Sequence, residues 1–386
     1  MDRNSIFCPN ENCKYYKITG AGNLKVKQYQ GTSQKIALMK CEECGTYFSE
    51  RKGTVYYGIK KPDYIFDQVM LLLMMRVAIK DITRFIGISE ETIGRWIKKA
   101  AGYLQALHDR VLKDLEVTEC QIDEVWSFVL MKKKTAQRKG ITDKEKIGDQ
   151  WIFLAIDVVH KVVLHWKVGK RTLKTAKEFI KELKGKLSSS PLYTTDELPA
   201  YEEAFLSNFC EETQPERTGK RGRPRKKPVR EVSKDLKLAQ THKHRRNGKV
   251  VKVTEEIVFG NEKEIREILE ASPVSNRINT SIVERMNGTA RAKVSPMVRN
   301  SYSFCKKVEM LEAQLTIYFA YYNLIWIHSR LKRTAACLAG LVSKAYTFRE
   351  LFELRTPEFI CGHEGQVPFS KKLRVRSYKG LIPLPG

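Results

Sequence analysis

The chain reads QIDEVWSFV from Gln121 to Val129, and the predicted fold is built outward from these residues. Its apolar residues predict a buried β-strand, and a carboxylate in the middle of such a strand is costly unless it binds something. Glu124 must point to the opposite face, because successive side chains of a strand alternate. We therefore expect Asp123 to belong to a functional site.

The segments after this strand predict the rest of a sheet. Residues 150–159 and 161–168 read as two strands of a hairpin, residues 175–187 as a helix, and residues 191–195 as a short strand that ends at Asp196. Three antiparallel strands, a helix and a parallel strand are the ribonuclease H-like (integrase-type) order. In that order, acids on the first strand and at the end of the fourth become neighbours.

Two further acids, Asp196 and Glu284, are candidates for the same site. Asp196 could instead form an Asx-turn, and Glu284 could instead complete a capping box with Ser281 at a helix start. Asn287 and Arg291 would share the helical face of Glu284, which favours a face for metal and DNA. Acids that are distant in sequence but meet in space can hold two divalent ions about 4 Å apart and promote attack on phosphodiesters.

The composition points to a polyanionic partner. The chain has 386 residues and a formal net charge of +26, with 70 Lys and Arg against 44 Asp and Glu. Basic side chains laid on phosphates release condensed counterions, so this excess favours nucleic acid over an anionic membrane. A merely self-repelling surface is the other interpretation. We expect a cytoplasmic protein, because we find no signal peptide and residues 69–75, the longest apolar stretch, are too few to cross a bilayer.

Four N-terminal cysteines form two pairs, Cys8 with Cys13 and Cys41 with Cys44, on either side of a predicted β-hairpin. Two pairs of thiolates carried on turns make a tetrahedral site that suits zinc. Four unligated cysteines are the alternative interpretation. Because so small a module has little core of its own, zinc would supply much of its folding free energy.

Residues 64–115 predict helices with a turn near their middle. Gly87 can turn the chain, and Ser89 can cap the helix that follows. An ordinary helical hairpin would share this pattern, but beside a zinc ribbon in a basic chain a helix-turn-helix is favoured. Its second helix would enter a DNA major groove. The residues that it would offer to the DNA are Thr92, Arg95, Lys98 and Lys99.

A basic insert of about residues 211–260 separates Asp196 from Glu284. Its most basic part, RGRPR, resembles an AT-hook, in which Gly and Pro keep the chain thin enough for arginines to enter a narrow minor groove. A loop that grips phosphates without reading bases is the alternative. The arginines concerned are Arg221, Arg223 and Arg225. Further on, the sequence predicts a β-ribbon that turns around Thr254-Glu255.

Together these features resemble the DDE transposases of bacterial insertion sequences, close to the group related to insertion sequence one. The matching stretches run in the family's order over nearly the whole chain. They are the paired cysteines, DEVWSFV from Asp123, WIFLAID from Trp151, Thr195-Asp196, and TSIVERMN from Thr280. The resemblance implies that Asp123, Asp196 and Glu284 form the catalytic metal-binding triad, with Mg²⁺ or Mn²⁺ as cofactor, and that terminal inverted repeats are the substrate.

We therefore expect a multidomain α/β protein with a zinc ribbon (1–60), a helix-turn-helix (61–116), a ribonuclease H-like catalytic domain (117–330) and a C-terminal tail (331–386). It would bind double-stranded DNA as a homodimer, because two element ends must be joined to target DNA. Two alternatives stay open. One is a non-catalytic DNA-binding regulator derived from a transposase, and the other is a ribonuclease H-like nuclease that selects DNA structure.

Overall fold

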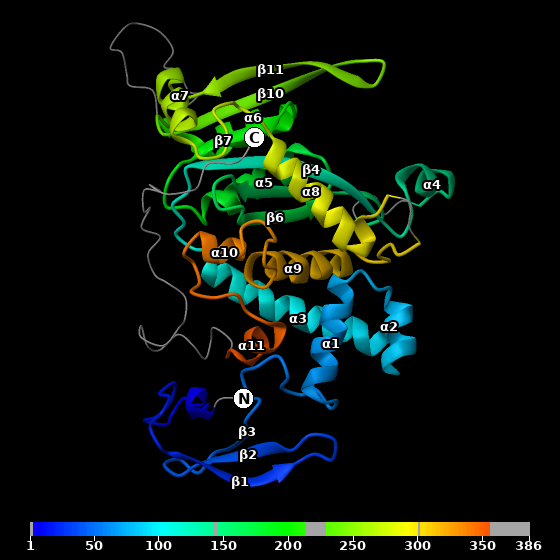
Figure 1. Cartoon of the computed structure of the whole chain (residues 1–386), viewed down its shortest axis with the longest axis vertical. Helices are drawn as coiled ribbons and strands as arrows, with labels where there is room; N and C mark the ends of the chain where they lie inside the picture. Colours follow the sequence, from blue (N-terminus) through cyan, green and yellow to red (C-terminus); the bar gives the residue numbers. More distant parts are fainter. Residues whose placement is uncertain (1–2, 142–145, 214–228, 300–301, 356–386) are drawn as a thin grey trace, which may run out of the picture.

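The computed structural model describes residues 3–141, 146–213, 229–299 and 302–355. The protein is mixed α/β, and its centre is a mixed six-stranded sheet with the order β11-β10-β7-β4-β5-β6 (Figure 1). Helices lie on both faces of this sheet, and a separate three-stranded sheet lies near the N-terminus. Among the described helices, none has both the length and the apolar character needed to span a bilayer.

The first half of the central sheet follows the predicted order. β4 (Glu119–Val129), β5 (Gly148–Asp157) and β6 (Val163–Gly169) are successive antiparallel strands, with a short helix, α4 (Lys133–Arg138), between the first two. After α5 (Leu173–Lys184), the chain returns as a strand parallel to β4. That strand, β7 (Leu192–Asp196), ends at the second candidate acid.

The second half extends the sheet beyond β7. After α6 (Pro199–Phe209), the short strands β8 (Cys210–Thr213) and β9 (Val229–Val232) pair with each other. β10 (Lys237–Arg246) then runs parallel to β7, and β11 (Lys249–Phe259) runs antiparallel to β10. A part of the predicted insert is therefore a part of the central sheet.

The turn of this ribbon is not where it was predicted. Thr254 pairs with His242 inside a continuous β11, and the chain turns at Asn247-Gly248, where φ is 51° and 75°. Two-residue hairpin turns often need positive φ at both positions, which Asn and Gly tolerate and β-branched Thr does not. The prediction of a turn at Thr254-Glu255 was wrong because it overlooked this Asn-Gly pair.

Two layers of helices enclose the sheet. α5 and α6 lie on one face, whereas α8 (Ser281–Lys293) and α9 (Val308–Leu324) lie on the other (Figure 1). Between β11 and α9 the chain also forms α7 (Glu262–Ala271) and the 3₁₀ turn η2 (Ser295–Met297). α9 is buried on almost every side, because the sheet lies on one flank and another long helix, α3, on the other.

The helical region predicted to bind DNA comprises α1 (Asp63–Met74), α2 (Ile79–Ile86) and α3 (Glu90–Val111). Gly87 ends α2 with φ 72°, and the Ser89 hydroxyl caps α3 by accepting a hydrogen bond from the backbone N–H of Thr92, as predicted. α3 continues well past the predicted recognition segment and packs along α9. The helical region and the central sheet thus share one hydrophobic core.

The N-terminal module begins with η1 (Arg3–Ser5) and contains β1 (Leu24–Gln30), β2 (Ile36–Cys41) and β3 (Tyr47–Ser49). β1 and β2 pair antiparallel, which confirms the predicted hairpin. Its buried apolar side chains form a small cluster separate from the main core. The module therefore has little apolar burial with which to stabilise itself.

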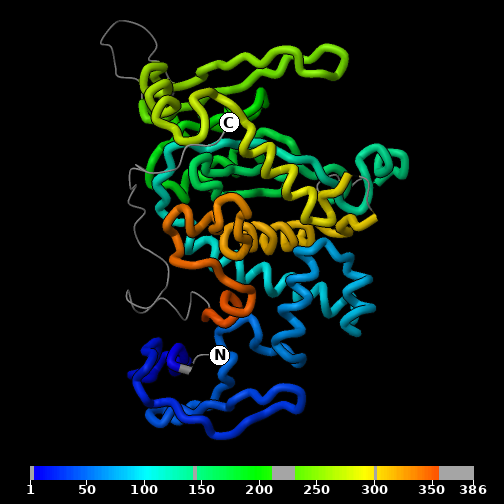
Figure 2. Tube along the Cα trace, in the orientation of Figure 1, coloured from blue at the N-terminus to red at the C-terminus, as the bar shows by residue number. Residues whose placement is uncertain are grey.

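The segment predicted as a C-terminal tail is folded in its first part. It carries α10 (Ala335–Leu338) and α11 (Phe348–Glu353), and the chain returns past α3 towards the N-terminal module (Figure 2). Phe352 is fully buried and lies edge-on to Phe66 of α1, with 5.3 Å between ring centroids. Apolar residues at 346–352 explain this packing, and residues 356–386 lie outside the described ranges.

Candidate active site and cysteine cluster

Asp123, Asp196 and Glu284 lie on three neighbouring elements, with Asp196 close enough to act on Asp123 and linked by shared contacts to Glu284. β4 and β7 pair in parallel up to the residues just before Asp123 and Asp196, so these two acids lie on neighbouring strands. Glu284 lies in the first turn of α8. The Thr280 hydroxyl links two of the acids, because its Oγ1 lies 2.9 Å from Asp196 Oδ1 and 2.9 Å from Glu284 Oε1.

Asp123 is held from α8 by Asn287. Asn287 Nδ2 donates to Asp123 Oδ2 at 2.8 Å, and the backbone N–H of Glu124 donates to Asp123 Oδ1 at 2.8 Å. Burial raises the pKa of Asp123 to about 7, and the negative charges of Glu124 and Asp196 act in the same direction. A cation beside Asp123 would reverse this effect and keep its carboxylate ionised.

Asn287 also offers an oxygen to the site. The residue is 5% exposed, and its Oδ1 is buried and has no hydrogen-bond partner within the described part of the chain. A buried amide oxygen without a partner costs free energy, so such an atom next to a carboxylate is a natural ligand for a cation. The predicted role of Asn287 was in DNA binding, whereas here it contacts the candidate catalytic acid.

Lys243 completes the site and was not predicted. Its Nζ lies 3.1 Å from Asp196 Oδ1 and 3.0 Å from Asp196 Oδ2, donates to Thr280 Oγ1 at 3.2 Å, and forms an ion pair with Glu284. Thr241, two residues earlier on β10, donates to Asp196 Oδ1 at 3.0 Å. The Asp196 carboxylate therefore bonds to other residues of the site and does not form the alternative Asx-turn.

Gln121 fixes the start of α8 against the sheet. Its side-chain Oε1 accepts hydrogen bonds from the backbone N–H groups of Ile282 (2.9 Å) and Val283 (3.1 Å). These are first-turn N–H groups that a helix cannot satisfy by itself. Gln121 is two residues before Asp123 on β4. Its contact therefore positions the start of α8, and with it Glu284, relative to Asp123.

The capping-box alternative for Glu284 is wrong. The residue that precedes α8 is Thr280, and its side chain makes no capping bond. Ser281 instead donates from its hydroxyl to Asn279 Oδ1 at 2.6 Å, while Glu284 is bonded to the Thr280 side chain and Lys243. With Gln121 supplying the cap, the Glu284 carboxylate faces the other acids.

Glu124 serves the opposite face of β4, as strand alternation predicts. It is 9% exposed, pairs with Arg171 and accepts a hydrogen bond from Tyr201 OH at 3.0 Å. Arg171 in turn lies over the ring of Trp151, 4.7 Å from its centroid. Glu124 is therefore a buried, paired carboxylate of the fold and not a fourth ligand.

The residues predicted to bind DNA have different surroundings. Arg95 donates from Nη2 to Thr92 Oγ1 at 3.1 Å and stays exposed, as does Lys98, whereas the Lys99 ammonium is bonded to the backbone oxygen of Tyr57. Arg291 lies near Asp123, and burial lowers the pKa of its guanidinium. Arg221, Arg223 and Arg225 fall outside the described residues.

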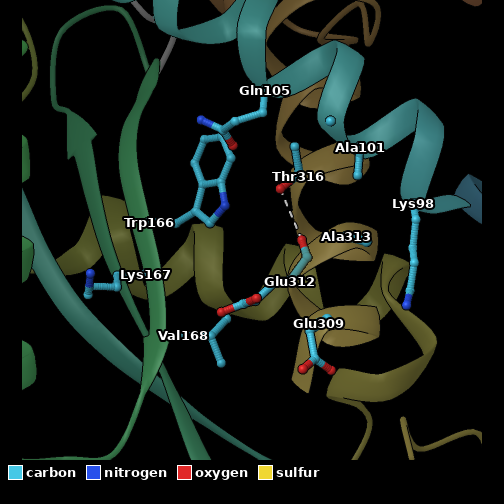
Figure 3. A pocket seen from close by; sticks show the side chains of 11 residues that line it. Lys98, Ala101, Gln105, Trp166, Lys167, Val168, Glu309, Glu312, Ala313 and Thr316 are labelled. Carbon is cyan, nitrogen blue, oxygen red and sulfur yellow. Dashed lines mark hydrogen bonds between the residues drawn. The ribbon is translucent and has the colours of Figure 1, made fainter. Parts of the chain in front are cut away.

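Two hollows flank the first part of α3. Arg95 and Lys98 line a groove of about 780 Å³ whose walls include Phe304, Lys306 and a fully exposed Tyr302. The other hollow, of about 390 Å³, lies between α3, α9 and β6, where the α9 acids Glu309 and Glu312 lie opposite Trp166 and Val168 (Figure 3). Both hollows carry acids, because Asp81, Glu90 and Glu91 also line the first groove.

The four N-terminal cysteines converge as predicted. The sulfur atoms of Cys8, Cys13, Cys41 and Cys44 all lie within 4.8 Å of one another and could hold a metal ion such as zinc. Three of the residues are buried, and Cys44 is partly exposed. Four sulfur ligands fit the tetrahedral geometry that zinc prefers.

Polar neighbours tune these thiols. A hydrogen bond with the Thr46 hydroxyl lowers the pKa of Cys44 to about 6, whereas burial raises the pKa of Cys8. Asn23 Nδ2 donates to Cys41 Sγ at 3.1 Å, and Cys44 Sγ lies 3.1 Å from Thr46 Oγ1. Such contacts orient thiolates around a metal ion.

The two clusters have different chemistry. The cysteines supply soft sulfur ligands for a structural ion, while the acids and Asn287 supply hard oxygen ligands of the kind that Mg²⁺ and Mn²⁺ accept. No protein-family model matches this chain, and no curated protein matches it in sequence. The function must therefore be argued from these residues.

Proposed function

We propose that the protein is a DDE-type DNA transposase that binds the terminal inverted repeats of its element and catalyses metal-dependent cleavage and transfer of DNA strands. The meeting of Asp123, Asp196 and Glu284 beside the unpartnered Oδ1 of Asn287 carries this proposal. A protein that only binds DNA has no need of such a cluster. The order of β4 to β7 supports a ribonuclease H-like fold.

The oxygen donors fit Mg²⁺ or Mn²⁺. When bound, the metal would activate a water or a 3′-hydroxyl and stabilise the leaving oxygen of the phosphodiester. Asp123 and Asp196 would bind the ion, and Asn287 would hold the Asp123 carboxylate in place. Arg291, near Asp123, would neutralise phosphates of the bound strand.

The N-terminal half would recognise the element's ends. The cysteine cluster supports a zinc ribbon, and the turn between α2 and α3 supports a helix-turn-helix. Arg95 and Lys98, on the groove that also holds Tyr302, would contact the duplex. We expect two copies of the chain in the active complex, since two ends must be joined, and a cytoplasmic location.

The direct test is strand transfer. Full-length protein with Mg²⁺ or Mn²⁺ would be incubated with a pre-cleaved duplex that carries the element's own terminal repeat and with a target plasmid. We expect joined products from the wild type and none from Asp123→Ala or Glu284→Ala. Glu197→Ala is the matched control, because Glu197 is an exposed acid next to Asp196 and should leave transfer unchanged. Transfer that survives in both triad variants would refute the proposal.

One observation favours a second candidate, a non-catalytic DNA-binding regulator derived from a transposase. Lys243 already neutralises Asp196 and Glu284, so the acids could be inert. Mn²⁺ binding separates the two candidates. A transposase should bind Mn²⁺ in a way that Asp123→Asn abolishes, whereas a regulator should bind the terminal repeat tightly without binding Mn²⁺ at the triad.

A further inference from the structure

The Lys243 ammonium lies among the triad acids like a bound cation. It contacts both carboxylate oxygens of Asp196, pairs with Glu284 and donates to Thr280. Four oxygen atoms from three residues therefore surround one positive charge. Arrangements of this kind are typical of a cation site, and here the cation is supplied by the chain itself.

The backbone holds Lys243 in this position. β10 is an interior strand, hydrogen-bonded to β7 on one side and to β11 on the other. Thr241 is the register partner of Asp196, and Lys243 lies two residues further along, so both side chains project from the same face beside the acid. The Lys243 side chain is 23% exposed. Its ammonium is held there by ion pairs with Asp196 and Glu284.

In the other half of the site, Arg291 lies near Asp123 but forms no ion pair with it within the described part of the chain. Asp123 is held by the Asn287 amide and a backbone N–H, not by a cation. Asn287 Oδ1 is unpartnered in the described part of the chain, although the residue is 5% exposed. The carboxylate of Asp123 and this buried oxygen are thus two oxygen donors that no ion pair of the described residues neutralises.

We propose that the site binds a single divalent cation, at Asp123, Asp196 and Asn287 Oδ1, and that Lys243 permanently occupies the place of a second ion beside Glu284. This inference rests on the proposed function and replaces the two ions expected from the sequence. One divalent ion and one ammonium balance three carboxylates. A second divalent ion would have to displace the Lys243 ammonium from Asp196 and Glu284.

Lys243 then has a direct role at the substrate. With one face on Asp196 and Glu284, the ammonium would meet the phosphate on its other side and stabilise negative charge that develops on an oxygen during transfer. The three N–H donors of Lys243 already bond Asp196, Thr280 and Glu284, so a phosphate oxygen would take the place of one of these acceptors. Glu284 would act by holding Lys243 and not by binding metal.

The experiment counts Mn²⁺ ions on the full-length, zinc-loaded protein, by electron paramagnetic resonance of free Mn²⁺ and by calorimetry. We expect one ion per wild-type chain and none for Asp123→Asn. Lys243→Met removes the charge but keeps the length, and we expect it to bind two ions. Lys243→Arg keeps the charge and should bind one. Circular dichroism would check the fold, and Lys243→Gln would replace Lys243→Met if that variant does not fold.

The outcomes distinguish this inference from the proposed function. Two ions on the wild type would show that Lys243 is displaced, which overturns the inference while strand transfer can still succeed. One ion on both wild type and Lys243→Met would also overturn it, because the charge would then not occupy an ion's place. If no chain binds Mn²⁺ and no transfer occurs, the proposed function itself fails, and the inference fails with it.

Discussion

The cysteine cluster and the carboxylate cluster differ in how they manage their own charge. The four sulfurs lie within 4.8 Å of one another, and their recorded polar neighbours are the neutral side chains of Asn23 and Thr46. The carboxylates have the Lys243 ammonium among them. We therefore expect the first cluster to need a metal ion in order to fold, whereas the second is held together by Lys243 and, under the proposed function, would use metal for chemistry.

The largest expected effect is loss of the N-terminal module when its metal is removed. Structural zinc contributes roughly 10–16 kcal/mol in comparable small sites, and the module's own apolar cluster is small. Chelation, or Cys41→Ser, should abolish hydrogen-exchange protection in β1–β3 and leave it intact in β4–β7. Cys337→Ser, a partly buried cysteine outside the cluster, is the control. Equal loss of protection in both sheets would contradict a metal requirement confined to the N-terminal module.

The next effect is a pH-dependent loss of stability at Asp123. Its pKa is about 7 in the folded protein because it is buried, against about 3.9 in an unfolded chain. Stability from this group is full below pH 4 and is lost as pH rises to 7, by up to about 4 kcal/mol. With zinc retained and no Mg²⁺ added, Asp123→Asn should therefore be more stable than wild type at pH 8 and similar at pH 4.

Urea unfolding at both pH values measures this difference. Glu267→Gln is the control, because Glu267 is exposed on α7 and its removal should leave the pH dependence unchanged. Parallel stability curves for wild type and Asp123→Asn would mean that the carboxylate site is not strained by its charge. The charge of Asp123 would then not destabilise the folded protein.

A smaller effect should follow from uncoupling α8 from β4. Gln121→Met leaves the N–H groups of Ile282 and Val283 without their acceptor, which costs about 1–3 kcal/mol in a buried setting. We expect lower stability in urea together with weaker Mn²⁺ binding, since the helix start positions Glu284 and Asn287. Ser281→Ala, at the same helix start but exposed, should change neither quantity by much. Weaker stability with unchanged Mn²⁺ affinity would contradict a positioning role.

The smallest effect concerns DNA contacts of the helical region. Arg95→Ala should weaken binding of the terminal repeat by about 1–3 kcal/mol if Arg95 reads a base, or lower the salt dependence by about one phosphate if it does not. Fluorescence anisotropy at several salt concentrations separates these cases. Lys181→Ala, an exposed cation on α5, is the matched control. Equal losses for both variants would indicate non-specific electrostatics.

The sequence was sufficient for features that rest on short-range patterns. The spacing of Cys8, Cys13, Cys41 and Cys44 predicted a cluster that the structure forms, because a hairpin brings such pairs together. The alternation of side chains along β4 correctly predicted that Asp123 and Glu124 lie on opposite faces of the sheet. The Asn247-Gly248 pair was a readable hairpin signal that would also have placed β10 and β11 correctly.

Other features depend on contacts that no local pattern marks. Lys243 is one lysine in a strongly basic segment, and its importance comes only from the parallel pairing of β10 with β7. The cap that Gln121 provides to α8 joins residues far apart in the chain. The burial of α11 against α1 was missed for the same reason, since apolar residues near the C-terminus do not reveal which surface they cover.

Localised cleavage by bound iron is the most direct test of a metal centre at Asp123 and Asp196, with Glu284 and Asn287 close to the ion. Fe²⁺ would replace Mg²⁺ in the zinc-loaded protein, and peroxide with ascorbate would generate hydroxyl radicals that cut the backbone near the ion. We predict cuts at Asp123, at Asp196 and around Glu284–Asn287, all absent in Asp123→Ala. Cuts elsewhere, or the same cuts in Asp123→Ala, would contradict a metal-dependent active site at this cluster.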